Sequence, residues 1–141
     1  ARAPIAMYSQ AGKVGPAYCT GVGKAMLAYL GEPELSDIID QQSFHRFTPQ
    51  TLTSALALRR ELSAIRARGF AFDREEHEPG IICVALPILT RTGRVLGAMS
   101  ITSSTQRTTL DALESLLPRM QSAASGIAAE AQDWRFPDAA E

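Results

Sequence analysis

Residues 69–103 read GFAFDREEHEPGIICVALPILTRTGRVLGAMSITS, and this stretch decides the fold of the chain. It contains two apolar runs, Gly80–Leu89 and Val95–Ser103, separated by a short segment whose polar side chains and glycine indicate a turn. Runs this rich in isoleucine, valine and leucine are typical of central strands that are covered on both faces. We therefore expect two neighbouring strands in the middle of the domain.

Side chains that alternate along these two strands could meet at one small site. Residues two apart in a strand share a face, so Cys83 shares a face with Ala85, and Ser100 shares one with Thr102. The two hydroxyl-bearing residues have apolar neighbours along the chain, and an acidic segment that begins at Asp73 precedes the first run. A thiol, two hydroxyls and a carboxylate could thus converge on one pocket.

Length and composition indicate one soluble globular domain. The chain has 141 residues, of which 45% are apolar and 21% charged. The net charge of −1 gives no electrostatic footprint for nucleic acid, so any contacts with DNA are expected outside this segment. No apolar run approaches the roughly 20 residues of a membrane span, and the first residues lack a signal-peptide core. Two distant cysteines do not make a disulfide framework, which favours a reducing cytoplasm.

The first half of the chain is predicted to hold two short strands and three helices. The strands are expected at Ala3–Ser9 and, as its partner, Ala17–Cys19. Capping and helix-forming residues predict the helices. One begins after Thr20 and ends at Gly31, one spans Glu34–Gln42 with Pro33 in its first turn, and one begins after Thr53 or Ser54 and ends at Arg68 with Gly69 as C-cap. Four arginines of the third helix indicate a solvated face rather than a nucleic-acid patch: Arg59, Arg60, Arg66 and Arg68.

A last helical segment is predicted after the two apolar strands, opened by Thr108 or Thr109. Pro118 should kink or split it near Leu116, and the tail Asp133–Glu141 is expected to be frayed. Its apolar stripe is Leu110, Leu113, Leu117, Met120, Ala124 and Ile127. The order of elements, β-β-α-α-α-β-β-β-α, indicates an α+β fold with a largely antiparallel sheet.

Two segments could carry a site, and the residues alone leave each one open. The segment Gly21–Lys24 is not a phosphate loop, because that motif requires a glycine at position 18 and a serine or threonine at position 25. Its glycines could present backbone amides to an anion, or they could merely allow the helix to pack closely on the sheet. Cys83 and His77 could be the nucleophile and base of a hydrolase, and with Asp73 they could bind zinc, although no specific catalytic or metal motif is present.

Both segments resemble the effector-binding domain of the IclR family of bacterial transcriptional regulators. The family pattern G-[FY]-A-x-D-x-E-E-x-x-x-G-x-x-C-x-A-x-P-[IV] is matched by Gly69, Phe70, Ala71, Asp73, Glu75, Glu76, Gly80, Cys83, Ala85, Pro87 and Ile88. A second family pattern, Thr-[AG]-x-Gly-Lys-A-x-L-A, is matched at Thr20–Ala28. The resemblance extends from about Ala3 to Ile127.

The resemblance implies a GAF-like fold, in which a curved, largely antiparallel β-sheet is flanked by α-helices. Residues 1–141 would then be a single effector-binding domain, globular to about residue 131 and followed by a tail at 132–141. The family's N-terminal winged helix-turn-helix domain has no counterpart in these residues. The implied role is to bind a small organic acid and to control operator binding by that separate domain. The segment 68–76 is a candidate for the mobile element.

The resemblance also implies the residues of the site. Backbone amides at Gly21 and Val22 would hold the carboxylate of the effector, Asp73 and Cys83 would contact it, and two hydroxyl-bearing residues would complete the site: Ser100 and Thr102. Family members commonly carry serine at both of the last two positions, so the extra methyl group of Thr102 would narrow the pocket. No enzymatic activity, cofactor, metal or membrane contact is implied. The expected partners are a small carboxylic acid, operator DNA through the separate domain, and further copies of the chain in a homodimer or homotetramer. The alternatives are a GAF-type signalling or dimerisation module that could bind a cyclic nucleotide, and a zinc sensor.

Overall fold

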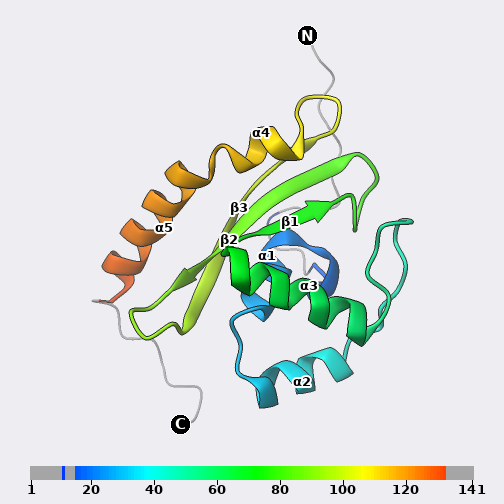
Figure 1. Cartoon of the computed structure of the whole chain (residues 1–141), viewed down its shortest axis with the longest axis horizontal. Helices are drawn as coiled ribbons and strands as arrows, with labels where there is room; N and C mark the ends of the chain where they lie inside the picture. Colours follow the sequence, from blue (N-terminus) through cyan, green and yellow to red (C-terminus); the bar gives the residue numbers. More distant parts are fainter. Residues whose placement is uncertain (1–10, 12–14, 133–141) are drawn as a thin grey trace.

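The computed structural model describes residue 11 and residues 15–132 of the chain (Figure 1). The predicted strand at Ala3–Ser9 and the predicted tail at Asp133–Glu141 lie outside these residues. The described elements are, in order, η1 (Ala17–Cys19), α1 (Gly21–Leu27), α2 (Glu32–Asp40), α3 (Ala55–Arg68), β1 (Ala71–Arg74), β2 (Ile81–Leu89), β3 (Val95–Ser104), α4 (Leu110–Glu114) and α5 (Leu117–Ala131).

The described strands form one antiparallel sheet in the order β1-β2-β3. In this register Cys83 pairs with Asp73 on one side and with Thr102 on the other, and Ala85 pairs with Ser100. The predicted pair of neighbouring strands is therefore confirmed, and so is the α+β fold with an antiparallel sheet flanked by helices (Figure 1).

The sheet has a hydrophobic cluster on each face. Alternate residues of β2 point to opposite sides, as the sequence predicts. Cys83 and Ala85 join a cluster with α1, α2 and α3, whereas Ile82, Val84 and Leu86 join a cluster with α4 and α5. In Figure 1, α5 runs along the outer side of the sheet, and α1 lies on the opposite side.

Capping residues fix the starts of α1, α3 and α4 and the end of α3 where the sequence predicts them, whereas α2 begins and ends two residues earlier than predicted. The side chains of Thr20, Ser54 and Thr109 accept hydrogen bonds from the first-turn amides of α1, α3 and α4. Gly69 ends α3 in the left-handed conformation with φ 92°, which glycine adopts at no steric cost. The last helical segment is split between Glu114 and Leu117, with its proline in the first turn of α5.

Three further local predictions are wrong. Residues 17–19 form a 3₁₀ helix rather than a strand, because short apolar runs do not distinguish helix from strand; here the Thr20 hydroxyl donates to the carbonyl of Pro16 and closes the turn. The first helix ends at Leu27 rather than at Gly31, which is the N-cap of α2. Ile127 is 47% exposed, since the buried side of α5 continues instead from Ala124 to the partly buried residue four positions on.

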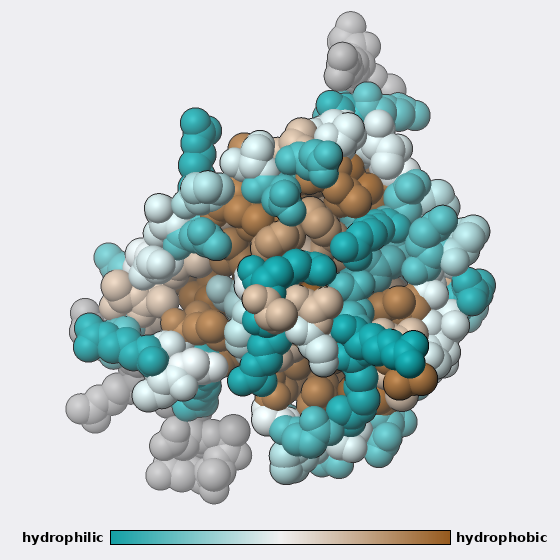
Figure 2. Space-filling model, viewed as in Figure 1, coloured by the Kyte–Doolittle hydropathy of each residue, from teal (hydrophilic) through white to brown (hydrophobic). Residues whose placement is uncertain are grey.

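Within the described residues, two of the four arginines of α3 are paired with carboxylates. Figure 2 shows hydrophilic and hydrophobic residues mixed over the face seen in Figure 1. Arg59 pairs with Glu32 at 2.7 Å through exposed side chains, as expected for a solvated face, whereas the pair of Arg68 with Glu61 at 3.3 Å is partly buried. Within the residues that the structure describes, no helix is long and apolar enough to cross a membrane.

Candidate functional site

All six residues predicted for the site line one cavity of about 290 Å³ beside the start of α1: Gly21, Val22, Asp73, Cys83, Ser100 and Thr102. They come from α1 and from all three described strands. Met26 also lines the cavity, as do His77 and Glu78 from the turn after β1.

The floor of the cavity is buried and its rim is open. Asp73 and Cys83 are 7% and 5% exposed and lie side by side in paired strands. Ser100 and Thr102 continue the same face of the sheet onto β3, but they are exposed. Their apolar neighbours along β3, Met99 and Ile101, are partly buried.

Asp73 is a buried carboxylate that titrates close to neutral pH. Burial raises the pKa of Asp73 to about 6, and the negative charge of Glu76 acts in the same direction. The Glu76 amide, which donates to Asp73 Oδ1 at 2.9 Å, and the positive charge of Lys24 act against this rise. A carboxyl group in this state can either accept or donate a hydrogen bond near neutral pH.

Cys83 is a protonated wall residue rather than a nucleophile. Burial raises the pKa of the Cys83 thiol to about 11, the charge of Asp73 adds to this rise, and the hydroxyls of Thr102 and Ser100 oppose it. Reactive cysteines have a lowered pKa. The arrangement therefore gives no support to a hydrolase that uses Cys83 and His77.

The two glycines at the start of α1 allow close packing. A methyl group at position 21 would overlap Cys83 Sγ and would lie 3.2 Å from the Ala85 side chain, and one at position 23 would lie 2.6 Å from the Ala17 backbone. Gly21 therefore allows α1 to pack closely on the sheet, whereas Gly23 allows it to pack closely on residues 17–20. This packing is compatible with a binding role, because the first amides of a helix have no acceptor within it and both Gly21 and Val22 line the cavity.

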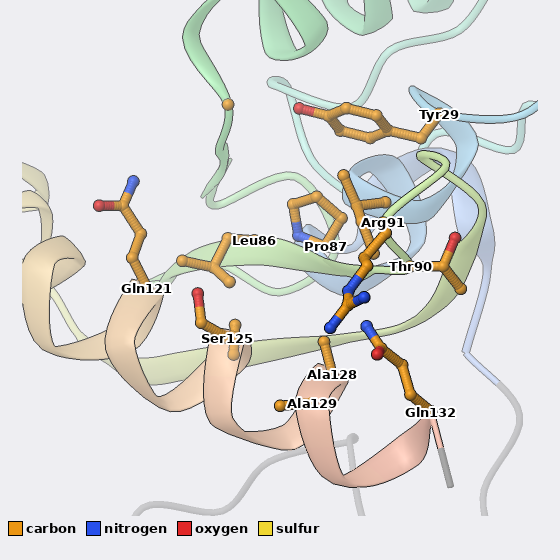
Figure 3. Close-up of a pocket in the computed structure, with 13 residues that line it drawn as sticks. Tyr29, Leu86, Pro87, Thr90, Arg91, Gln121, Ser125, Ala128, Ala129 and Gln132 are labelled. Carbon is orange, nitrogen blue, oxygen red and sulfur yellow. The ribbon is translucent and has the colours of Figure 1, made fainter. Parts of the chain in front are cut away.

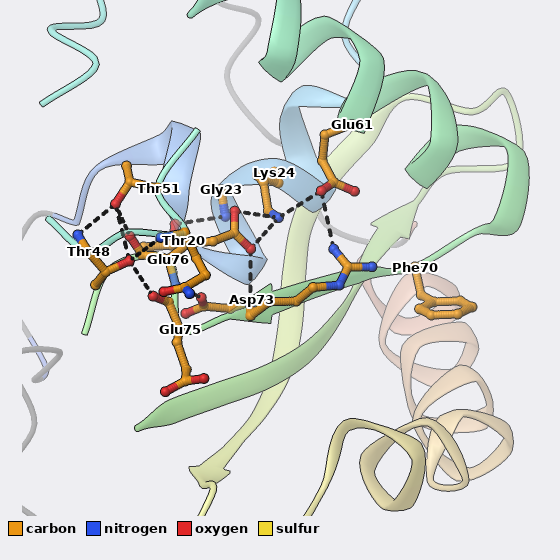
Figure 4. A network of polar contacts seen from close by, with 12 residues as sticks. Thr20, Gly23, Lys24, Thr48, Thr51, Glu61, Phe70, Asp73, Glu75 and Glu76 are labelled. Atoms are coloured by element: carbon orange, nitrogen blue, oxygen red, sulfur yellow. Dashed lines mark hydrogen bonds and ion pairs between the residues drawn. The ribbon is translucent and has the colours of Figure 1, made fainter. Parts of the chain in front are cut away.

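A buried ionic network lies directly beside the cavity (Figure 4). The Lys24 ammonium group lies 2.9 Å and 2.8 Å from the two carboxylate oxygens of Glu76 and 3.6 Å from Glu61 Oε2. Burial acts to raise the pKa of Glu61, but the surrounding cations, Lys24 first, outweigh it and lower the pKa. Thr48 and Thr51 donate to the backbone carbonyls of residues 75 and 76, both at 2.6 Å.

Sequence reasoning missed this network. The segment GVGKAML offers one signal, because Lys24 occupies the same helical face as the buried positions 21, 25 and 28. A lysine among small residues on the inner face of a helix requires a buried partner. Its partner, Glu76, is 52 residues away in the sequence.

A second cavity, of about 430 Å³, lies between α5 and the β2–β3 hairpin, with Tyr29 above it (Figure 3). Leu86 lines this second cavity. The polar side chains here are exposed, notably Arg91, Gln121 and Gln132, and the buried ones are apolar. The larger cavity therefore lacks the buried polar group that the smaller one has in Asp73.

The zinc interpretation receives no support from the described part of the chain. There, no three side chains of histidine, cysteine, aspartate or glutamate are arranged to hold a metal ion. Asp73 and Cys83 do share the cavity with His77, but these three do not form such a group.

Curated relatives of known name match most of this chain. The transcriptional regulator KdgR of Escherichia coli is 34% identical over 126 residues, which are 89% of this chain and 48% of KdgR. XynR, another E. coli regulator, is 40% identical over 100 residues, or 71% of this chain and 40% of XynR. The chain thus spans half or less of the length of these relatives.

Solved structures share the fold. IclR of Thermotoga maritima matches with a TM-score of 0.83 and 34% identity over 91% of this chain and 52% of that one. The inducer-binding domain of PobR from Acinetobacter, a double mutant in complex with 3-hydroxybenzoic acid, matches with a TM-score of 0.74 and 30% identity over 80% and 65% of the two chains.

A family model described as the C-terminal part of the bacterial transcriptional regulator IclR matches residues 2–129. The match includes both sequence patterns and every residue that lines the smaller cavity. Regulators of this family act in transcription and are not enzymes. This chain therefore belongs to the IclR family of bacterial transcriptional regulators, as its effector-binding domain.

Proposed function

We propose that this domain binds a small organic acid in the cavity beside α1 and thereby controls operator binding by a separate winged helix-turn-helix domain. The observation that carries the proposal is the convergence of the six predicted residues on one cavity with a buried carboxyl group at its floor. A volume of about 290 Å³ is at the lower end for ligand pockets, which suits a small ligand.

The contacts divide by chemistry. The amides of Gly21 and Val22 hold the carboxylate of the effector, because this helix start lines the cavity and its first amides have no acceptor within the helix. Ser100 and Thr102 exchange hydrogen bonds with the effector at the rim. Asp73 accepts from a hydroxyl group of the effector, and the protonated thiol of Cys83 forms part of the wall.

The PobR structure supports the class of ligand, since that relative holds an aromatic hydroxy acid in its inducer-binding domain. By analogy, residues 1–141 act as one effector domain of a longer cytoplasmic regulator that assembles as a homodimer or homotetramer. Operator DNA is contacted only through the separate domain. An effector can shift such a regulator only if it binds one arrangement of the protein more tightly than another, and we assign that rearrangement to the segment 68–76.

A thermal-shift screen against small carboxylates tests the proposal. The panel contains glyoxylate, pyruvate, gluconate and 3-hydroxybenzoate. An acid present at about 100 times its dissociation constant adds roughly 2.7 kcal/mol to the free energy of unfolding, which is seen as a rise in melting temperature. We expect this rise to disappear in Asp73→Ala and in Ser100→Ala.

A matched control separates the two cavities. Ser125 lines the larger cavity and is exposed, as Ser100 is in the smaller one. Ser125→Ala should therefore leave the shift unchanged. A melting-temperature shift that is lost in Ser125→Ala but kept in Ser100→Ala would place the acid in the larger cavity and contradict the proposal. A panel without any hit, together with a shift caused by zinc or a cyclic nucleotide, would replace the proposal with one of the alternatives.

A further inference from the structure

Lys24 has a fully buried side chain in the helix that borders the effector cavity. It is 0% exposed, and its ammonium group reaches from α1 to Glu76 and Glu61 (Figure 4). An ammonium group removed from water is tolerated only where carboxylates compensate its charge and accept its hydrogen bonds. Here Glu76 binds it through both carboxylate oxygens, at 2.9 Å and 2.8 Å.

Glu76 connects this buried cation to the effector site. Its backbone amide donates to Asp73 Oδ1 at 2.9 Å, and its Oε2 accepts from the amide of Arg74 at 3.0 Å. Its carbonyl oxygen accepts from the Thr51 hydroxyl at 2.6 Å. Hydrogen bonds thus fix both the side chain and the backbone of Glu76. The Glu76 amide in turn fixes one carboxylate oxygen of Asp73.

Charges of both signs face Asp73 from the elements packed around it. Lys24 approaches from α1, Cys83 from β2, and three residues follow in the turn after β1: Glu76, His77 and Glu78. The α3 carboxylate, Glu61, faces Lys24 and is paired with two arginines. Among these groups the carboxylates of Glu76 and Glu78 disfavour the ionised form of Asp73, whereas the Glu76 backbone amide and Lys24 favour it.

Packing alone does not require an ion pair at this place. Buried ion pairs are often replaced by apolar residues of similar volume without loss of stability, and sometimes with a gain. The pair joins α1, which borders the cavity, to Glu76, whose backbone amide donates to Asp73 in the same cavity. These two facts connect the pair to the site as well as to the core.

We propose that Lys24 and Glu76 are positioning residues of the effector site, which fix the orientation of Asp73 and set its charge. The importance of this for effector binding rests on the proposed function, in which Asp73 contacts the ligand. The effect on Asp73 itself does not depend on any ligand, so it can be measured in the free domain.

The test follows the side-chain carboxyl carbon of Asp73 by NMR as a function of pH, in the free domain. Lys24→Met removes the favouring cation, so the midpoint of the Asp73 titration should rise by about one pH unit. Glu76→Gln keeps the size and the backbone amide but removes the anion, so the midpoint should fall. A purely structural role would loosen the site in both variants and move both midpoints down, toward the value of an exposed aspartate.

Two further variants keep the test decisive. Arg59→Met removes an exposed cation of α3 whose partner is Glu32, and it should leave the midpoint where it is. If Lys24→Met does not fold, the double variant K24M/E76Q, in which no charge of the pair remains, is compared with Glu76→Gln alone. Removal of the lysine should again raise the midpoint.

Binding of 3-hydroxybenzoate and pyruvate, measured by calorimetry between pH 5 and pH 8, gives the second readout. For an acid that binds the wild type, the pH profile of its affinity should shift in each variant in the direction of the Asp73 midpoint. Midpoints that do not move, or that move the same way in both single variants, overturn the positioning role even if acids bind. Absence of binding by any acid, with opposite midpoint shifts, overturns the proposed function and leaves the positioning of Asp73 standing.

Discussion

The ammonium nitrogen of Lys24 lies 2.8 Å from Glu76 Oε2, and both side chains are almost completely buried, with 0% and 4% exposed. This contact joins the middle of α1 to the turn after β1, and both elements contribute residues to the lining of the cavity that contains Asp73. One ion pair therefore holds α1 relative to the turn whose Glu76 amide donates to the buried carboxyl group of Asp73.

Removal of one partner of the Lys24–Glu76 pair should lower the stability of the domain. In Lys24→Met the carboxylate of Glu76 stays buried without its cation, and such a change typically lowers the free energy of unfolding by about 3–5 kcal/mol. Urea unfolding of the domain measures this. The double variant K24M/E76M removes both charges and should recover most of the loss, because the two apolar side chains can pack against each other.

Arg59→Met is the matched comparison for this variant. It breaks a pair of similar length, 2.7 Å, whose side chains are 37% and 69% exposed. Exposed pairs contribute at most about 1 kcal/mol. A loss in Lys24→Met as small as the loss in Arg59→Met would mean that water reaches the buried pair.

Asp73→Asn should stabilise the free domain at neutral and alkaline pH. The folded state holds the proton of Asp73 more tightly than the unfolded chain does, with a pKa of about 6 against an ordinary value of 3.8. The stability associated with this proton is fully present below about pH 4 and is lost as the pH rises through 6. Asparagine keeps an oxygen for the Glu76 amide and carries no charge, so it avoids this loss.

The gain in the free energy of unfolding of Asp73→Asn should reach about 3 kcal/mol at pH 8 and about half of that at pH 5, as follows from the raised pKa of Asp73. Chemical unfolding at the two pH values measures it. A gain that is the same at both pH values would show that Asp73 does not titrate in this range. The same substitution should weaken acid binding, so stability and binding would change in opposite directions.

The candidate site was predictable because its residues follow local rules. Alternation along a strand places Cys83 on one face, and a capping threonine places the start of α1. The family pattern then connects these two segments. The register that sets Cys83 between Asp73 and Thr102 agrees with that reasoning.

What could not be predicted depends on contacts between distant segments. No local pattern pairs Lys24 with Glu76, since the choice among several neighbouring carboxylates is made by how α1 lies on the sheet. The short run at 17–19 became a 3₁₀ helix because its neighbours close a turn, which apolar content alone does not reveal.

Gly23→Ala should destabilise the domain by about 1–3 kcal/mol, the usual cost of overpacking. The added methyl group would lie 2.6 Å from both the Ala17 Cα and the Thr20 Oγ1, so backbone as well as side chain must shift. Gly126→Ala is the control. It lies inside α5 with open space around it, and alanine there should stabilise by about 0.5–1 kcal/mol. Thermal unfolding of the two variants should therefore shift in opposite directions; two shifts of the same sign would contradict the close approach of α1 to η1.

Cys83 should react slowly with a thiol reagent in the native domain. Its pKa of about 11 leaves roughly one thiol in a thousand ionised at pH 8, and only the thiolate attacks the reagent. We expect a rate on the order of 100-fold below that of free cysteine. Cys19, which is fully buried and has a pKa raised to about 12, should react more slowly still.

The measurement is a time course with a chromogenic disulfide at pH 8. Peptide mass mapping separates the two cysteines, and a denatured sample shows that both thiols are intact. Labelling of Cys83 at or above the rate of free cysteine would indicate an activated thiolate, and it would restore the hydrolase interpretation that the buried, protonated thiol argues against.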